Sequence, residues 1–260
     1  MDLKILTPKL LLRYKSALKE SPIERLDKVG KFDIPVNYFQ FYKSVSSVYS
    51  SRIEGEDIEF DSFFKHKFMG VQFRPDYTRR ADDLYAAYDF IDDNTITLQN
   101  IQKVHAIITS NILPVSQQGI LRTNPMFVIN SSDKIEYVAA EPNVVKTEID
   151  KLFADIDLLL ATDLDAFEVF YYAALIHLVF VKIHPFQDGN GRTARLLENW
   201  FLIRKIGHKA VAVKLEKNYY NNINHYYSNL RKIGLEYHEL DYGKSLDFLL
   251  MTAKGIEMDD

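Results

Sequence analysis

The sequence of 260 residues contains no cysteine, which excludes a disulfide scaffold, a thiolate metal site and a cysteine nucleophile. Glycine and proline are scarce, with 10 and 8 residues, so a turn-rich all-β architecture is disfavoured. The formal net charge of -4 gives no reason to expect electrostatic binding to nucleic acid or to an anionic membrane. The N-terminal segment lacks the order of a secretory signal, and together with the absence of cysteine this favours a cytoplasmic protein.

Long apolar runs are missing as well. The most apolar stretch, 169–181, is shorter than the roughly 20 residues that a membrane span needs, and it contains His177. This stretch therefore predicts a buried core helix, and we expect no membrane contact. His177 itself is interpreted as a hydrogen-bonded core histidine, because no carboxylate accompanies it at a spacing typical of a metal site.

Most of the chain repeats apolar residues at helical spacing. The pattern predicts helices over about 37–54, from about 76, from about 97, over 143–160, over 165–183, from about 191 to a stop at Gly207, and around 219–231 and 244–253.

One segment departs from this pattern. Two β-prone runs, 126–129 and 135–138, flank the polar turn 130–133 and predict a β-hairpin. We therefore expect an all-α helical bundle with one hairpin. Its expected parts are an N-terminal helical region over 1–97, a core over 98–205 and C-terminal helices over 206–260.

The segment HPFQDGNGRTAR, residues 184–195, concentrates groups that carry chemistry. Gly189 and Gly191 lie where a helix begins, and such a turn exposes backbone N–H groups in the positive field of the helix dipole. This arrangement binds phosphates. Arg192 and Arg195 lie near one face of the same helix and would add charge-assisted hydrogen bonds.

Two further residues complete the predicted site. Asp188 is a carboxylate among phosphate-binding groups, so we expect a Mg²⁺ ion between it and the ligand. His184, with an ordinary pKa of about 6.5, can accept a proton from a hydroxyl group. A single histidine, a glycine turn or an aspartate before a helix is usually structural. Their concentration within twelve residues favours a functional interpretation.

The segment resembles the Fic motif, H-x-F-x-D/E-G-N-G-R-x-x-R, and matches it at every defined position. The resemblance implies a Fic fold, with the hairpin as a flap. It also implies that AMP is transferred from ATP to a Ser, Thr or Tyr hydroxyl of a target protein, with release of pyrophosphate. In these terms His184 is the base, Asp188 holds Mg²⁺, and Phe186 anchors the loop in the core.

The resemblance assigns the phosphates to the following residues. Asn190 and the backbone of Gly189 and Gly191 would hold the α- and β-phosphates. Arg192 would neutralise the leaving pyrophosphate, and Arg195 would bind the γ-phosphate.

Three other segments fit the same family. Tyr226 and Tyr227 could line the adenine pocket, although core packing explains them almost as well. The flap, 126–138, would pair with an extended stretch of the target protein through main-chain hydrogen bonds. Residues Ser50 to Gly55 (SSRIEG) resemble the family's inhibitory motif, S/T-x-x-x-E-G/N. This likeness implies self-inhibition, in which Glu54 pairs with Arg195.

Other interpretations remain open at this stage. They are removal of AMP from a modified target, transfer of another phosphate-containing group, and a nucleotide-binding interaction module without turnover. The intact glycine turn favours AMP transfer over a kinase. The complete set of His184, Asp188 and both arginines argues against lost catalysis. The sequence does not name the target protein, and it leaves a homo-oligomer open.

Overall fold

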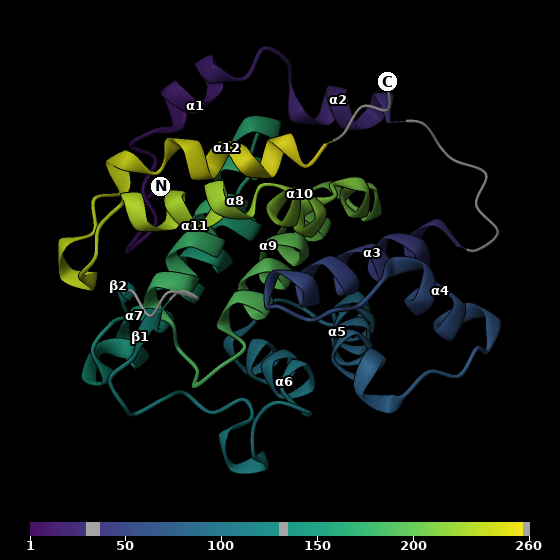
Figure 1. Ribbon diagram of the computed structural model, residues 1–260. Coiled ribbons are helices and arrows are strands. Elements are labelled where there is room, and N and C mark those ends of the chain that lie inside the picture. The colour runs from purple at the N-terminus through teal and green to yellow at the C-terminus, as the bar shows by residue number, and fades with distance from the viewer. Residues whose placement is uncertain (30–36, 130–134, 257–260) are drawn as a thin grey trace.

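The fold consists of twelve α-helices and one hairpin within the described part of the chain, residues 1–29, 37–129 and 135–256 of a computed structural model. Figure 1 shows α8 and α9 in the middle of the molecule, with α3, α4 and α5 on one side and the hairpin and α7 on the other. The helices are α1 Leu11–Ala17, α2 Pro22–Lys28, α3 Tyr38–Ile53, α4 Phe60–Met69, α5 Pro75–Asp93, α6 Leu98–Ile108, α7 Pro142–Ala161, α8 Ala166–Ile183, α9 Asn190–Ile206, α10 Leu215–Asn221, α11 Ile223–Lys232 and α12 Leu246–Lys254. The strands are β1 Phe127–Ile129 and β2 Ile135–Val138.

Helix α8 is the centre of the core. It starts at a capping box, in which Asp165 accepts a hydrogen bond from the Glu168 N–H and Glu168 accepts one from the Asp165 N–H. All its residues from Val169 to Ile183 are buried, because the helix is apolar on every side and other helices enclose it. Its length and composition would suit a membrane span, yet 83% of its 18 residues are buried inside the fold. The prediction of a core helix is confirmed.

A buried polar cluster joins α8 and α9 to the C-terminal helices. Glu198 of α9 accepts hydrogen bonds from Tyr219 and from Thr252, and its carboxylate lies 2.7 Å from Nδ1 of His177. The other ring nitrogen of His177 lies 3.0 Å from the Tyr226 hydroxyl. His177 is fully buried and hydrogen-bonded at both nitrogens, as the sequence predicted for a core histidine.

Helix α3 is fixed along its length. Its first turn is capped by Asn37, whose side chain accepts a hydrogen bond from the Phe39 N–H. Farther along, Lys43 forms ion pairs with Asp89 and Asp92 of α5. Ser46 donates to Glu216 of α10 at 2.8 Å.

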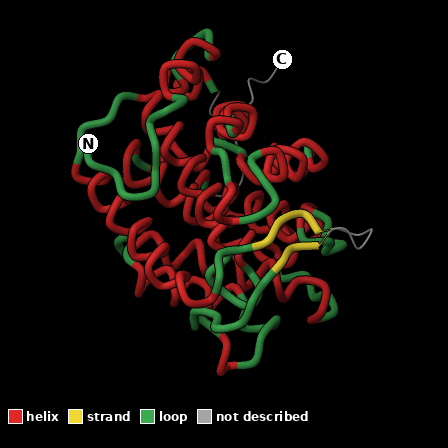
Figure 2. Tube along the Cα trace, turned by 90° about the vertical axis from the view of Figure 1, so that its left-hand side faces the viewer, coloured by secondary structure: helices red, strands yellow, loops and turns green. Residues whose placement is uncertain are grey.

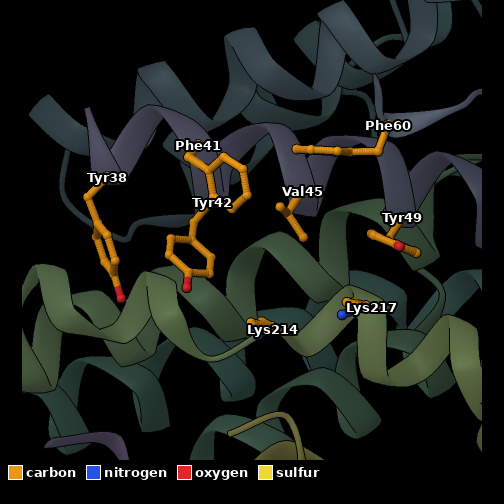
Figure 3. Close-up of a pocket in the computed structure, with 8 residues that line it drawn as sticks. All are labelled: Tyr38, Phe41, Tyr42, Val45, Tyr49, Phe60, Lys214 and Lys217. Atoms are coloured by element: carbon orange, nitrogen blue, oxygen red, sulfur yellow. The ribbon is translucent and has the colours of Figure 1, made fainter. Parts of the chain in front are cut away.

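Aromatic side chains of α3 pack in two directions: Phe41 packs on Phe60, as Figure 3 shows, and Tyr49 packs on Tyr220 of α10 with ring centroids 5.6 Å apart. A pocket of about 230 Å³ lies beside α3, and no residue of the segment 184–195 lines it. It is lined by Tyr38, Phe41, Tyr42, Val45, Tyr49, Phe60, Lys214 and Lys217.

Strands β1 and β2 pair as the predicted hairpin, and Figure 2 shows them in yellow at the edge of the helical body. Val128 pairs with Tyr137, and Ile129 pairs with Ile135. The predicted turn, 130–133, lies outside the described residues. The fold class, all-α with a single hairpin, is confirmed.

One sequence prediction needs correction, and three helices were not predicted individually. The segment 219–231 is not one helix, because the chain breaks at Asn222, whose side-chain amide donates to the Asn218 carbonyl at 3.0 Å. Helices α1, α2 and α4 were not predicted individually. They have 7, 7 and 10 residues, which is too short for an apolar repeat to stand out. The boundaries of the three expected parts remain a prediction, and one hydrophobic cluster contains residues from all three.

The Glu198 cluster yields a stability prediction. Replacing Glu198 with Ala leaves the buried donors of Tyr219 and Thr252 without their acceptor, so the free energy of unfolding should fall by about 3 kcal/mol. Urea unfolding followed by circular dichroism measures the change. Lys146→Ala, which removes an exposed ion pair with Asp150, is the control and should change the free energy by about 0.5 kcal/mol or less. Equal effects of the two substitutions would contradict the structural role of Glu198.

Candidate active site

The loop between α8 and α9 begins with an unusual backbone conformation. His184 follows the last residue of α8 with φ of 52°, the single left-handed non-glycine residue within the described ranges. An L-residue with a side chain pays of order 1–2 kcal/mol for this conformation, so the surroundings must hold it. At the other end, Gly189 with φ of 75° precedes α9, where glycine meets no such cost.

Arg122 holds the first half of this loop. Its backbone N–H donates to the Pro185 carbonyl at 2.9 Å, and its Nε donates to the His184 carbonyl at 2.6 Å. Further bonds of its guanidinium reach the carbonyls of Ile183 and Ala140. One arginine therefore fixes the end of α8 and the left-handed residue together.

Phe186 and Asn190 hold the second half. Phe186 is fully buried and stacks on the imidazole of His105, with ring centroids 3.8 Å apart. The Asn190 side chain accepts from the Phe186 N–H at 2.9 Å and donates to the Phe186 carbonyl at 2.8 Å. The sequence assigned Asn190 to the phosphates. Its buried side chain is instead committed to the loop, so only its backbone N–H, at the start of α9, is suited to that task.

His105 of α6 fixes the position of Asp188. Its Nδ1 accepts a hydrogen bond from the Gly119 N–H at 2.8 Å, so its Nε2 carries the proton and donates to the Asp188 carbonyl at 2.8 Å. Burial lowers the pKa of His105 to about 4, which keeps this tautomer neutral. The Asp188 carboxylate accepts from the Gly189 N–H, and Asp188 is exposed to solvent.

A divalent cation fits the chemistry of Asp188 only as a single-carboxylate site. In the part of the chain that the structure describes, no three His, Asp or Glu side chains cluster in a way that could hold a metal. Mg²⁺ characteristically binds one or two carboxylates together with substrate phosphates and water. The exposed carboxylate at the start of α9 suits this second kind of site.

Arg195 is paired with the end of α3. Its guanidinium is 1% exposed and donates to Glu54 at 2.6 Å, and its Nε donates to the Ser50 hydroxyl at 3.0 Å. Burial alone would raise the pKa of the Glu54 carboxyl, but Arg195 and Arg192 outweigh this effect and lower the pKa below its usual value. The structure thus brings together the two residues that the sequence paired.

Gly191 leaves room for this contact. A Cβ atom at Gly191 would lie 2.7 Å from Oε1 of Glu54, so the carboxylate lies directly against the first turn of α9. Arg192 is buried beside it, with its NH2 3.8 Å from Glu56, which itself pairs with Arg80 of α5. The carboxylates of residues 54 and 56 therefore lie against the two arginines that a phosphate would need.

His184 is held on its Nδ1 side. This nitrogen lies 3.2 Å from the Tyr137 hydroxyl of β2 and 3.3 Å from the Val181 carbonyl. Desolvation lowers the pKa of His184 to about 4, so the imidazole is neutral at pH 7. Tyr226 is 2% exposed, and Tyr227 is partly buried beside it. Their role in an adenine pocket remains a prediction.

Several residues of the site were not found from the sequence. Four residues make their contacts with segments that are distant in the chain, and none of them belongs to a recognised motif. They are Arg122, His105, Tyr137 and Glu56. Glu56 offered a local signal, because it lies two residues after Glu54 and directly after the inhibitory motif. The other three offered no signal in a single sequence.

Comparisons with known proteins agree with this geometry. The chain is 33% identical over 132 residues to the protein adenylyltransferase Fic of Nematostella vectensis, covering 50% of this chain and 28% of that protein. It is 29% identical over 113 residues to protein adenylyltransferase fic-1 of Caenorhabditis elegans, covering 44% of this chain and 20% of that protein. The chain thus spans less than a third of the length of these relatives.

Solved structures share the fold. A Fic family protein from Desulfovibrio desulfuricans superposes with a TM-score of 0.75 at 16% identity, covering 98% of this chain and 74% of the other. A Fic domain containing signalling protein from Bacteroides thetaiotaomicron gives 0.62 at 18% identity, covering 95% and 91%. The Fic/DOC family pattern matches residues 95–202, which include the whole loop and the hairpin. Residues 95–202 of this chain therefore match the Fic/DOC family.

Proposed function

We propose that this chain is a protein adenylyltransferase that transfers AMP from ATP to a Ser, Thr or Tyr hydroxyl of a target protein. The observation that carries the proposal is the loop itself, in which a neutral imidazole, a carboxylate and a glycine turn with two arginines are fixed on one frame. The names of the relatives support this activity. Such a reaction depends mainly on positioning and on charge stabilisation, which this frame supplies.

In the proposed reaction the target oxygen attacks the α-phosphorus, and the bond from that phosphorus to the β-phosphate oxygen breaks. His184, neutral at pH 7, accepts the hydroxyl proton. Arg192 and Arg195 offset the charge on the leaving pyrophosphate. A Mg²⁺ ion held by Asp188 and phosphate oxygens would neutralise part of the phosphate charge.

We further propose that the chain inhibits itself in the state described. Glu54 forms a salt bridge with Arg195, whose guanidinium is proposed to bind the γ-phosphate. The Glu54 carboxylate also lies against the first turn of α9. A phosphate bound at the start of α9 would be repelled by the Glu54 carboxylate, and both groups need the hydrogen-bond donors of Arg195. ATP can then enter in a productive pose only when Glu54 leaves.

The hairpin supports docking of the target along one strand. The Val138 N–H of β2 already donates to the Leu235 carbonyl at 2.8 Å, and Glu136 pairs with Arg231 of α11. Among the described residues, no backbone group outside the hairpin pairs with β1. Phe127 and Ile129 of β1 are more than half exposed. An extended target segment would therefore add to the outer edge of β1.

Removal of AMP from a modified target is the second candidate. The position of Glu54 favours it, because its carboxylate lies at the phosphate side of the loop and influences the pKa of His184. A carboxylate placed there could activate water. The two activities respond oppositely to loss of Glu54, since AMP removal would stop and AMP transfer would rise.

Replacing Glu54 with Gly should raise auto-modification from radiolabelled ATP by at least about tenfold, because loss of a contact worth 1.4 kcal/mol already changes occupancy tenfold. Label retained on the purified chain after electrophoresis gives the rate. Asp57→Gly, which removes an exposed carboxylate three residues away, is the matched control. If both variants label no faster than the wild type, self-inhibition by Glu54 is wrong.

In the Glu54→Gly background, His184→Ala should keep the affinity for ATP and lose AMP transfer by about 100-fold or more, since the proton acceptor is removed. Calorimetry measures binding, and label incorporation measures transfer. Transfer at an unchanged rate would rule out His184 as the base.

The pH profile gives a further prediction. With a pKa of about 4, His184 stays in its deprotonated, active form from pH 8 down to about pH 5. Transfer by Glu54→Gly at saturating ATP should therefore stay level between pH 8 and pH 6. An imidazole with the ordinary pKa of about 6.5 would lose about three quarters of its active form by pH 6. A decline of that size would contradict the lowered pKa.

A further inference from the structure

Tyr137 of β2 contacts the proposed base directly. Its side chain is 4% exposed, and its hydroxyl donates to the Val181 carbonyl at 3.0 Å. The same hydroxyl lies 3.2 Å from Nδ1 of His184. The Val181 carbonyl lies 3.3 Å from that nitrogen, so the three polar atoms form a closed triangle.

A bulge in β2 turns Tyr137 toward the loop. Val128 pairs with Tyr137 while the next residue, Ile129, pairs with Ile135, so the register of β2 shifts by one residue at Glu136. Such a bulge places two consecutive side chains out of the usual alternation. Glu136 and Tyr137 are consequently both buried, with Glu136 bonded to Arg231 and Tyr137 directed at His184.

The Tyr137 ring is held in place from two further directions. Nζ of Lys182 lies 4.1 Å from the ring centroid, a cation–π distance. The next residue of the strand, Val138, is tied through its N–H to Leu235. Tyr137 thus belongs to the part of the hairpin that is fixed to the helical body.

The hydrogen bonds of the triangle determine the tautomer of His184. A carbonyl oxygen can only accept, and a tyrosine hydroxyl has a single proton, which here goes to Val181. Both neighbours of Nδ1 therefore present lone pairs to it, so this nitrogen avoids lone-pair repulsion only when it carries a proton, which the two acceptors share. Burial raises the pKa of Tyr137 well above its usual value, so the hydroxyl keeps its proton.

We propose that Tyr137 is a positioning residue for the transfer reaction: its hydroxyl, together with the Val181 carbonyl, holds His184 as the Nδ1–H tautomer and leaves Nε2 as the proton acceptor. The proposal rests on the proposed role of His184 as the base. It also joins the target-docking hairpin to the catalytic histidine through one hydrogen bond. The wrong tautomer would present a proton, instead of a lone pair, to the target hydroxyl.

The test uses Tyr137→Phe, which keeps the ring and removes only the hydroxyl. The matched control is Tyr171→Phe, since Tyr171 is equally buried and its hydroxyl donates to the Thr7 carbonyl at 2.7 Å, away from the loop. Both substitutions are made in the Glu54→Gly background. We expect Tyr137→Phe to lower kcat about tenfold or more with the KM for ATP within about twofold, and Tyr171→Phe to leave both unchanged.

A second readout does not depend on activity. Nitrogen NMR of ¹⁵N-histidine-labelled protein, with His184→Gln used for assignment, reports which ring nitrogen of His184 is protonated. The wild type should show the proton on Nδ1, and Tyr137→Phe should show a mixture of tautomers, with Tyr171→Phe as in the wild type. Thermal unfolding of both variants checks that each is folded.

Unchanged kcat in Tyr137→Phe, or an unchanged tautomer, would overturn the positioning role. An equal loss of kcat in both tyrosine variants would also overturn it, because the effect would then be one of general stability. If Glu54→Gly itself transfers no AMP, the proposed function fails, and the NMR comparison still decides whether Tyr137 sets the tautomer.

Discussion

Burial of α8 from Val169 to Ile183 is the constraint on which the rest of the structure depends. A helix that is apolar on every side is stable only when other elements enclose it, so the remaining helices and the hairpin are arranged around it. The loop leaves the buried end of this helix at His184. Its frame is therefore continuous with the core, and Phe186 and Asn190 extend the packing into the loop itself. A reaction that depends on the exact position of its groups benefits when the loop that carries them is fixed to the core in this way.

The second constraint is charge. Two guanidinium groups, Arg192 and Arg195, are buried beside each other, and buried charges need partners. In the state described, Glu54 and Glu56 supply them, and in the proposed active state phosphates would do so. Under the proposed self-inhibition, the same carboxylates would both stabilise the fold and occupy the place of the phosphates, so inhibition and folding would share their contacts. Lys43 fixes α3 to α5 through its ion pair with Asp89, and the fixed helix holds the two carboxylates that follow its C-terminal end in position.

Features that depend on a local sequence pattern could be predicted from the sequence. The long helices, the hairpin and the pairing of Glu54 with Arg195 all follow from periodicity or from a motif, and the structure has each of them. Contacts that join distant segments could not be predicted. The bond from Arg122 to His184 spans 62 residues, and that from His105 to Asp188 spans 83. The bonds between the Asn190 side chain and the Phe186 backbone could not be predicted either, because a motif gives residue identity without showing which atoms the loop already uses.

The left-handed backbone of His184 places two requirements on one position that no single residue type satisfies. Glycine suits the backbone but has no imidazole, whereas histidine supplies the imidazole and bears the conformational cost. Stability and activity are therefore opposed at this residue. Replacing His184 with glycine would therefore relieve the backbone cost and at the same time remove the imidazole that the proposed reaction needs.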